Sequence, residues 1–556
     1  MKTNKQNKKT NIIANAKDFI TSTFNDPMEI LVTLILSTFL FFIMSLSALG
    51  QACFQSSFGG SSLEEMQSVL ETSEGNMVFA GRTISGGSKE MIYVVQTDAT
   101  GNLMWSKTYG DLNSSEMASS IIEGNNGSLI LTGYTYSHGN TTDADITLVK
   151  LDKYGKLQWS KVYLGLSNEF GAEVTTTHDG GYYITGSTYS SGAGLTDIIL
   201  IKTDSNGNML WNKTYGGNGL DNASSLKTTA DGGAIITGFT ISKGAGNKDA
   251  IVIKTDNLGD TLWTRTFGTS YADQAWGICI SPNGGYAIAG DSKSFGNGDD
   301  DIYIVRIDDN GNKLWEKAYG TNESEKATDI KALADGSFIL TGTYGAWNSN
   351  SNNALLIKLD QSGNISWANR YTGNGYSQGN SVFPTTDQGY VLAGNTQVGN
   401  SYDGILIKTN ENGESWCNQQ SLTLNDITGT SIQSSGLVTG PGGFQHTNVS
   451  FTSNDLMPGI LSFCYSCDLP SPEFSYIDSG LNVSFTELST GEQSYLWDMG
   501  DGSTSANANP NHSYNSYSTY QVCLSVENIC GSDSICHNIE IQSTNTSIGE
   551  YVTSNN

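Results

Sequence analysis

Short apolar runs separated by Gly, Asn and Asp recur along residues 54–416. In one stretch the runs cover residues 172–177, 181–186, 197–204 and 207–216, and each is rich in β-branched or aromatic residues. Runs of this length between turn residues are typical of β-strands. No part of this region shows the 3.6-residue period of an amphipathic helix. The pattern therefore predicts four strands in each unit of about 52 residues.

Two markers repeat with the same period. A tryptophan stands in the fourth strand of each unit, and a glycine ends the second strand. The tryptophans are Trp105, Trp159, Trp211, Trp263, Trp315, Trp367 and Trp416, and the glycines are Gly81, Gly133, Gly186, Gly238, Gly290, Gly342 and Gly394. Seven radially repeated units of four short strands are typical of a β-propeller. We therefore predict a seven-bladed β-propeller over residues 51–417. The repeats also resemble those of secreted bacterial surface proteins.

The two ends of the repeat region complement each other. Residues 54–59 align with residues 105–110 of the first unit, so the region begins with a piece of a fourth strand. The last unit stops just after Trp416. We expect the N-terminal piece to complete the last unit and close the ring, which removes exposed sheet edges.

A different unit follows at residues 468–543. Residues 497–502 read Trp-Asp-Met-Gly-Asp-Gly, residues 509–514 read Asn-Pro-Asn-His-Ser-Tyr, and residues 520–526 alternate around Val522, Leu524 and Val526. This pattern resembles a PKD domain, an immunoglobulin-like β-sandwich, with Met499 in place of the usual Phe. The resemblance implies an all-β spacer or adhesion module.

The remaining segments indicate export. Residues 30–49 are almost wholly apolar and follow several lysines, which is typical of a secretory signal, or of a membrane anchor if it is not cleaved. We read residues 1–50 as this leader, residues 418–467 as a Ser/Thr/Gly-rich connector with a few extra strands, and residues 544–556 as a disordered tail. The start of that tail resembles the lead-in to the sorting domain of type IX secretion cargo, although the Pro-Asn-Pro strand motif is absent.

Charge and cysteine content narrow the classes of partner. The formal net charge of −27 excludes a nucleic-acid-binding role, which needs a basic surface. Eight cysteines in an exported chain suggest disulfides. One scheme pairs Cys523 with Cys536 across a hairpin, Cys467 with Cys530, and Cys417 with Cys464. A rival scheme pairs Cys53 with Cys417.

Two sets of residues are candidates for binding. Carboxylates precede the third strand of most units, and five of them would line a single mouth if these positions lie at one rim of the ring: Asp145, Asp197, Asp249, Asp301 and Asp403. They would bind a cation such as Ca²⁺ or an amino group, or else they satisfy backbone donors in the turn. Aromatic residues that break the repeat are the second set: Trp276, Trp347, Tyr134 and Tyr136.

The sequence contains no catalytic motif that we identify, and no cofactor is expected. We expect a non-enzymatic binding or scaffold protein, secreted or at the cell surface, whose partner is an extracellular protein or a polysaccharide. A lectin-like glycan-binding module is one alternative. A propeller hydrolase acting on polysaccharide is the other.

Overall fold

The computed structural model describes residues 53–542 with short gaps, and all statements below concern the described residues. The gaps fall at residues 61, 86–88, 112, 138–142, 296–298, 346–351, 373–374, 400, 416–418, 428–431, 435–437, 442–444, 450–451, 456–458, 465–471, 490–493 and 529–530. The chain divides into two compact units, one of residues 52–466 and one that includes residues 467–556. Apart from a single 3₁₀ turn at Asn125–Gly127, the regular structure described is β-strand, as the sequence predicted.

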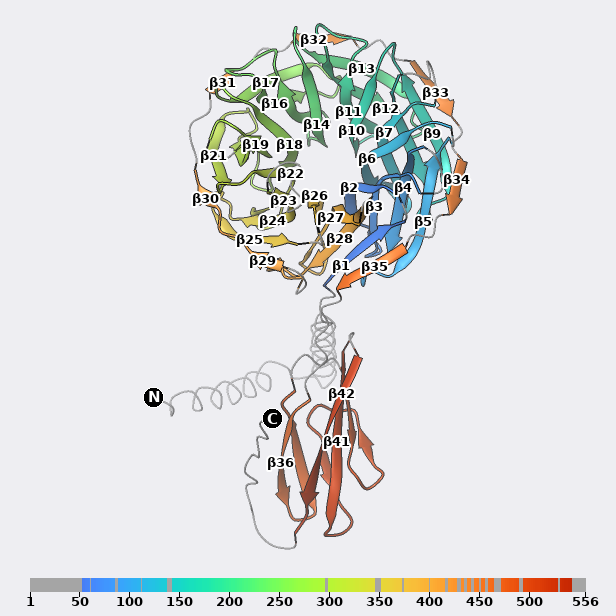
Figure 1. Cartoon of the computed structure of the whole chain (residues 1–556), viewed down its shortest axis with the longest axis vertical. Helices are drawn as coiled ribbons and strands as arrows, with labels where there is room; N and C mark the ends of the chain where they lie inside the picture. The colour runs from blue at the N-terminus through green and yellow to red at the C-terminus, as the bar shows by residue number, and fades with distance from the viewer. Residues whose placement is uncertain are drawn as a thin grey trace, which may run out of the picture. The chain divides into compact units, whose positions relative to one another are not determined.

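The first unit consists of seven antiparallel sheets, numbered 1 to 7 in chain order, that surround a common centre (Figure 1). Sheet 1 holds β2 (Glu64–Glu71), β3 (Met77–Thr83), β4 (Met91–Thr97) and β5 (Leu103–Gly110). Sheet 2 holds β6 (Glu116–Glu123), β7 (Leu129–Thr135), β8 (Asp145–Leu151) and β9 (Leu157–Leu164). Sheet 3 holds β10 (Glu169–Thr176), β11 (Tyr182–Thr188), β12 (Asp197–Thr203) and β13 (Met209–Gly216).

The same four-strand order continues around the ring. Sheet 4 holds β14 (Asp221–Thr228), β15 (Ala234–Thr240), β16 (Asp249–Thr255) and β17 (Thr261–Gly268). Sheet 5 holds β18 (Asp273–Ile280), β19 (Tyr286–Ser292), β20 (Asp301–Ile307) and β21 (Lys313–Gly320). Sheet 6 holds β22 (Glu325–Ala332), β23 (Phe338–Tyr344), β24 (Asn353–Leu359) and β25 (Ile365–Tyr371), and sheet 7 holds β26 (Ser377–Pro384), β27 (Tyr390–Val398) and β28 (Ser401–Thr409). The first strand of each sheet lies nearest the centre (Figure 1).

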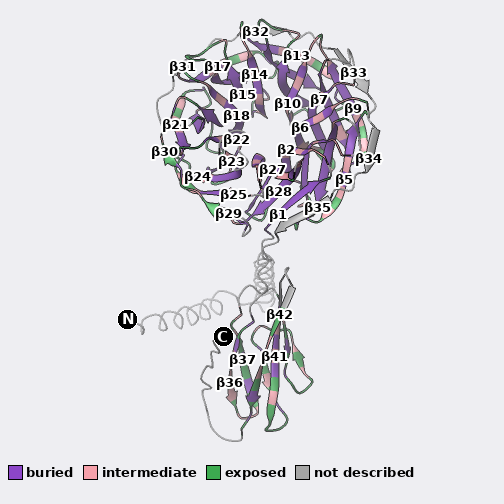
Figure 2. Cartoon of the chain, in the orientation of Figure 1, coloured by how far each residue is buried: buried purple, intermediate pink, exposed green. Residues whose placement is uncertain are grey.

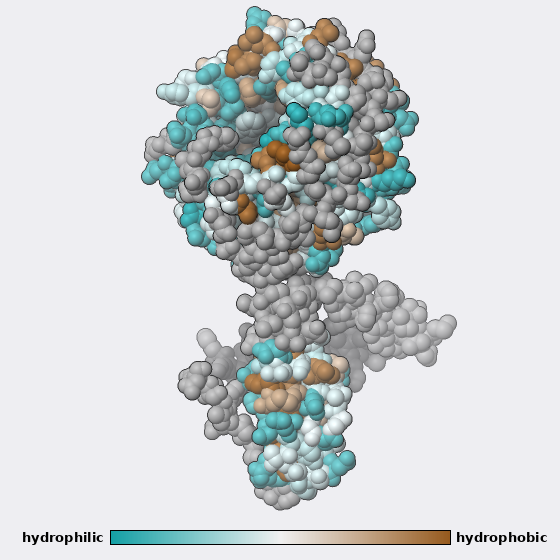
Figure 3. Space-filling view, turned by 45° about the vertical axis from the view of Figure 1, so that its right-hand side comes forward, coloured by the Kyte–Doolittle hydropathy of each residue, from teal (hydrophilic) through white to brown (hydrophobic). Residues whose placement is uncertain are grey.

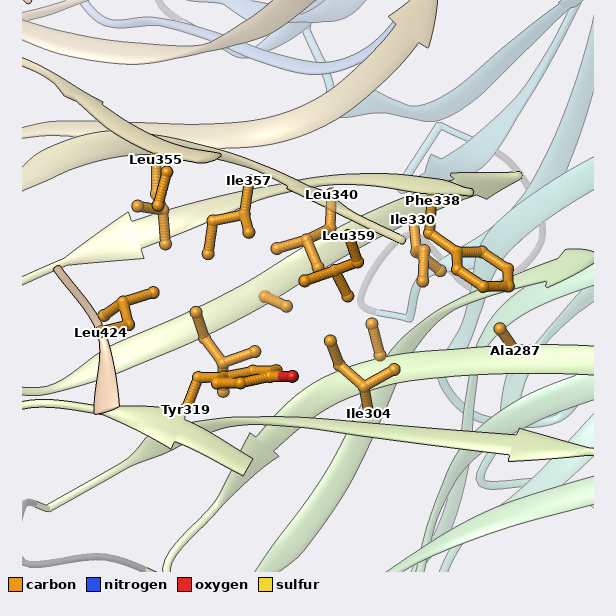
Figure 4. Close-up of a cluster of buried hydrophobic side chains, with 14 of the residues drawn as sticks. Ala287, Ile304, Tyr319, Ile330, Phe338, Leu340, Leu355, Ile357, Leu359 and Leu424 are labelled. Carbon is orange, nitrogen blue, oxygen red and sulfur yellow. The ribbon is translucent and has the colours of Figure 1, made fainter. Parts of the chain in front are cut away.

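The core lies between neighbouring sheets rather than at one central point. Between sheets 5 and 6, Ile304 and Tyr319 face Leu340 and Leu355, and these side chains are almost fully buried (Figure 4). The burial pattern repeats around the ring, where the inner strands are buried and exposed residues concentrate on the outside (Figure 2). Each sheet therefore buries both faces, which explains why its middle strands read as continuous apolar runs.

The repeated tryptophan packs against a glycine of the next sheet. At Gly207 a Cβ would stand 2.8 Å from the Trp159 ring, and the φ angle there is +74°. The same contact joins Trp105 to Gly155, Trp211 to Gly259, Trp263 to Gly311, Trp315 to Gly363 and Trp367 to Gly413. Only glycine suits both the space and the φ angle. The tryptophans thus repeat along the sequence because the same tryptophan–glycine contact recurs between successive sheets.

The N-terminal strand closes the ring. Strand β1 (Phe54–Gly59) pairs antiparallel with β28, so it becomes the fourth strand of sheet 7. Phe54 takes the place of the tryptophan, because its ring lies against Gly101 of sheet 1. The predicted closure is therefore confirmed.

Residues 419–464 form an outer belt that the sequence did not reveal. We predicted a connector here, yet the segment runs back around the ring and adds a fifth strand to every sheet (Figure 1). Its strands are β29 (Gln419–Ser421), β30 (Asn425–Asp426), β31 (Ile432–Ser434), β32 (Val438–Pro441), β33 (Gln445–Val449), β34 (Thr452–Asp455) and β35 (Gly459–Cys464), which join sheets 6, 5, 4, 3, 2, 1 and 7 in that order. The belt covers the outer edge strands, which would otherwise be open to pairing with other chains.

The second unit is a sandwich of two sheets. One contains β36 (Phe474–Ser479), β37 (Asn482–Glu487) and β40 (Asn511–Ser513). The other contains β38 (Ser494–Asp498), β39 (Thr504–Ser505), β41 (Thr519–Asn528) and β42 (Gly531–Glu540). Trp497 and Met499 lie in its core beside Val522, Leu524 and Val526, as the sequence predicted.

The cysteine predictions have mixed outcomes. Cys523 and Cys536 form the expected disulfide across β41 and β42. Cys53 is a free, buried thiol, so the rival pairing with Cys417 is wrong. The pairs Cys417–Cys464 and Cys467–Cys530 lie outside the side chains that the structure describes, as do the leader and the tail. Where residues are described, no helix is long and apolar enough to span a membrane.

Removing the disulfide should loosen the sandwich unit alone. Its two cysteines are 13 residues apart, and closing a loop of about that length stabilises a fold by about 3 kcal/mol. We expect the double substitution Cys523→Ser and Cys536→Ser to lower the unfolding transition of residues 472–542 while leaving that of the ring in place. Calorimetry resolves the two transitions, and equal shifts in both would contradict this assignment.

A candidate binding cavity at the ring axis

Every first strand carries a β-bulge at the same place. In sheet 4, Ala223 pairs with Gly238 and Ser225 pairs with Thr237, so Ser224 is left unpaired between them. The seven unpaired residues are Gln67, Ser119, Ala172, Ser224, Trp276, Thr328 and Asn380. A bulge re-aims a side chain away from the regular alternation. All seven line one cavity on the axis of the ring.

This cavity has a volume of about 790 Å³ and is bounded by the first strands of the seven sheets. Such a volume is typical of a site for a small ligand. Its wall is not symmetric, because the residues that follow the bulges differ from sheet to sheet.

Sheets 3, 4 and 6 supply the charged side of the wall. Lys227 Nζ lies 2.6 Å from Glu173 Oε1, and Lys331 Nζ lies 2.6 Å from Asp329 Oδ1. Burial lowers the pKa of Lys331, but Asp329 and Glu173 outweigh this effect, so its pKa is raised and the ammonium group stays charged.

The two carboxylates also join neighbouring sheets. Glu173 Oε2 accepts the Leu226 amide at 2.6 Å, and Asp329 Oδ2 accepts the Val382 amide at 3.1 Å. Between other sheets a serine hydroxyl accepts this hydrogen bond instead: Ser68 Oγ accepts the Ile121 amide at 3.2 Å. The charged pairs are therefore built on a structural ring of hydrogen bonds.

Sheets 1, 2 and 7 supply the apolar side. Leu70, Ile122 and Phe383 occupy the positions that Lys227 and Lys331 occupy in their own strands. At the equivalent position of sheet 5, burial raises the pKa of the Cys279 thiol to about 12, so this group is not a nucleophile near neutral pH. The cavity thus has two ammonium groups on one side, and on the other it has apolar side chains together with the carboxylates of Glu71 and Glu123.

One of the aromatic candidates lines this cavity directly. Trp276 lines it and its indole N–H donates to Asp291. Phe170 also lines it, and the Tyr134 ring lies 5.2 Å from Phe170 and 5.9 Å from Tyr136. Tyr189, half exposed, also contacts Phe170, with the two ring centroids 6.4 Å apart. Of the described candidates, Trp276 lines the cavity, whereas Tyr134 reaches it only through its contact with Phe170 and Tyr136 only through Tyr134. Trp347 lies outside the described residues.

The acidic candidates do not line the cavity. Asp145, Asp197, Asp249, Asp301 and Asp403 are at most 4% exposed and lie within the junctions between sheets. Several accept backbone amides, such as that of Gly165 on Asp145 at 3.1 Å. Burial raises the pKa of Asp145 and Asp403 to about 6 and that of Asp301 to about 7. The open acidic mouth is therefore wrong, because these carboxylates point into the sheet junctions instead of toward the axis.

Sequence reasoning missed the charged pairs and the bulges. Glu173 and Lys227 come from different repeats, so the sequence of either repeat alone does not predict the ion pair between them. One available signal was that the acidic and lysine residues of sheets 3, 4 and 6 depart from the uncharged residues found at the same positions of the other sheets.

Comparison with known proteins supports the sandwich. The family model of the PKD domain matches residues 477–543. The PKD1 domain of Vibrio anguillarum Epp is 27% identical and covers 14% of this chain and 98% of its own, with a TM-score of 0.14. The chain therefore carries a C-terminal PKD domain.

The ring has weaker likenesses. The regulatory protein FlaEY of Caulobacter vibrioides is 28% identical over 199 residues, which are 31% of this chain and 20% of that protein, so the chain spans about a fifth of its length. PorZ, a surface component of the type IX secretion system of Porphyromonas gingivalis, is 8% identical, covers 87% of this chain and all of its own, and has a TM-score of 0.17. Neither likeness is strong enough to assign a family or an activity to the ring.

Proposed function

We propose that the seven sheets form a seven-bladed β-propeller, and that the chain is an exported, non-enzymatic binding protein that acts at the cell surface or outside the cell. The sevenfold repeat, the strand that closes the ring and the order of sheets around a centre support the first part. The PKD domain and the Cys523–Cys536 disulfide support an oxidising, extracellular setting.

The axial cavity is the binding site in this proposal, and a short polar chain such as an oligosaccharide is its ligand. The asymmetric wall of the cavity carries this inference. Aromatic rings offer flat apolar faces, while the lysines and amide side chains offer polar partners. On the face of the ring that Figure 3 shows, the coloured apolar residues lie in separate patches among hydrophilic ones.

Hydrolysis is a weaker alternative. Glycosidases need a carboxylic acid and a second carboxylate that are free to act on the scissile bond. Glu173 and Asp329 are each held by a lysine and a backbone amide. Glu71 and Glu123 also line the cavity, and each accepts a backbone amide and a hydroxyl, from Thr386 and from Ser73 respectively. We therefore assign no acid–base pair to these four carboxylates.

A glycan array tests this proposal with the full chain. We expect binding to one class of oligosaccharide, and the substitution Trp276→Ala should weaken that binding at least tenfold because it removes the indole from the cavity wall, a loss of about 1.4 kcal/mol or more.

The matched control is Tyr154→Ala, since Tyr154 is 66% exposed on a turn outside the cavity. Equal glycan binding by the parent chain and both variants would contradict the proposal that the axial cavity is the binding site. Failure of the parent chain to bind any glycan would contradict the ligand class.

A further inference from the structure

Four aromatic side chains form a row that runs from the wall of the axial cavity to the surface of the ring. Phe170, in the first strand of sheet 3, lines the cavity. The centroid of its ring lies 5.2 Å from that of Tyr134 and 6.4 Å from that of Tyr189. Tyr136 extends the row from Tyr134 at 5.9 Å. Because Tyr189 is 50% exposed, this aromatic row connects the cavity wall with solvent.

The fold does not require aromatic residues at these places. Phe170 is the second residue of its strand, and Lys326 holds the same place in sheet 6. Tyr189 directly follows the second strand of sheet 3, where sheet 5 has Lys293 and sheet 6 has Gly345. Sheets of the same ring are therefore built with polar residues or glycine at these positions. The repeat alone does not explain why aromatic rings meet between sheets 2 and 3.

The charges beside the aromatic row disfavour an anionic ligand. Arg82 lies near Tyr134, and its guanidinium group pairs with Glu65 at 2.6 Å and with Glu90 at 2.8 Å. Two carboxylates against one guanidinium group leave a net negative charge at this flank. Burial raises the pKa of Tyr134, so its hydroxyl is neutral. Tyrosine combines an apolar ring with a hydroxyl that donates and accepts hydrogen bonds, which suits an uncharged chain rich in hydroxyl groups.

We propose that the aromatic row is an outer subsite, which holds the part of an uncharged oligosaccharide that extends beyond the axial cavity. This inference rests on the proposed function, because it takes the cavity as the inner subsite. The cavity, with a volume of about 790 Å³, has the size of a small-ligand site, so a longer chain continues outside it. Phe170 belongs to both subsites, and the row offers contact area on rigid rings at a low cost in conformational entropy.

The dependence of affinity on chain length tests this subsite with the full chain. We would measure, by calorimetric titration, the binding of disaccharides and hexasaccharides from the uncharged cellulose, xylan, mannan and chitin series. We expect the hexasaccharide of one series to bind about tenfold more tightly than its disaccharide, because it also contacts the aromatic row, a gain of about 1.4 kcal/mol. Tyr189→Ala should remove most of this gain and leave the affinity for the disaccharide unchanged.

Three further variants separate the two subsites. Tyr189→Phe keeps the ring and should keep most of the gain. Trp276→Ala should weaken the binding of both lengths, because it changes the cavity itself. The matched control is Tyr271→Ala, since Tyr271 is 64% exposed in the loop before the first strand of sheet 5 and lies outside the aromatic row. It should bind both lengths as the parent chain does.

The outcomes distinguish this subsite from the cavity. Equal affinities of the parent chain for the two lengths, or a gain that survives Tyr189→Ala, would overturn the outer subsite and leave the cavity as the binding site. Binding of neither length in any of the uncharged series would also overturn it. The glycan array, which includes acidic glycans, decides separately whether the cavity binds an oligosaccharide at all.

Discussion

Replacing Ser57 with proline opens the ring. Strand β1 lies inside sheet 7, where Ser57 pairs with Ile405 of β28 on one side and with Leu461 of β35 on the other. The residue is fully buried. Proline lacks the N–H that a strand within a sheet donates to its neighbour, and its ring does not fit such a strand, so the cost is about 3 kcal/mol or more. We expect a large drop in the free energy of unfolding of the ring in urea.

The matched control is Ser421→Pro. Ser421 is exposed at the end of the three-residue strand β29, which pairs with β25 alone. The change should therefore cost much less than Ser57→Pro. Equal losses from the two substitutions would contradict the role of β1 in closing the ring.

Replacing the belt, residues 419–464, with a Gly-Ser linker of the same length should make the chain self-associate. The replacement exposes the outer edge strand of every sheet, and exposed edges pair with other chains. We expect a lower thermal midpoint and oligomers in light scattering. Replacing only residues 419–434 uncovers three sheets and should give a smaller effect of the same kind. A monomer with an unchanged midpoint would show that the belt is dispensable.

The period of the sequence predicted the arrangement of the ring because it encodes contacts between sheets. A tryptophan recurs at the position of Trp159 because it packs on a glycine of the next sheet, here Gly207. Phe54 aligns with the tryptophans because it makes the same kind of contact with Gly101. The belt has no such signature. Its strands are as short as the two residues of β30, which is too short for alternation to be visible in a polar segment.

The sequence predicted only part of the candidate site, because it gives the position of a residue along a strand but not the direction of its side chain. Trp276 stood out because it breaks the repeat, and it does line the cavity. The acidic positions stood out because they repeat, yet repetition gave their place along the strand and not the direction of the side chain. Asp197 begins a third strand and Trp276 lies within a first strand, but a bulge at Trp276 lets its side chain line the cavity while Asp197 points at Gly216. Bulges leave no mark in the sequence that we could have used.

The central claim is that the axial cavity binds the ligand, and filling the cavity tests it most directly. Ser224 occupies the same bulge position in sheet 4 that Trp276 occupies in sheet 5, so a tryptophan is compatible with that position. We would measure the affinity of the best glycan from the array for the parent chain, for Ser224→Trp and for Ser205→Trp, which places the same side chain on an exposed turn. We predict that Ser224→Trp loses glycan binding while its thermal midpoint equals that of the parent chain. Ser205→Trp should bind the glycan with the affinity of the parent chain. Undiminished binding by a folded Ser224→Trp variant would contradict it.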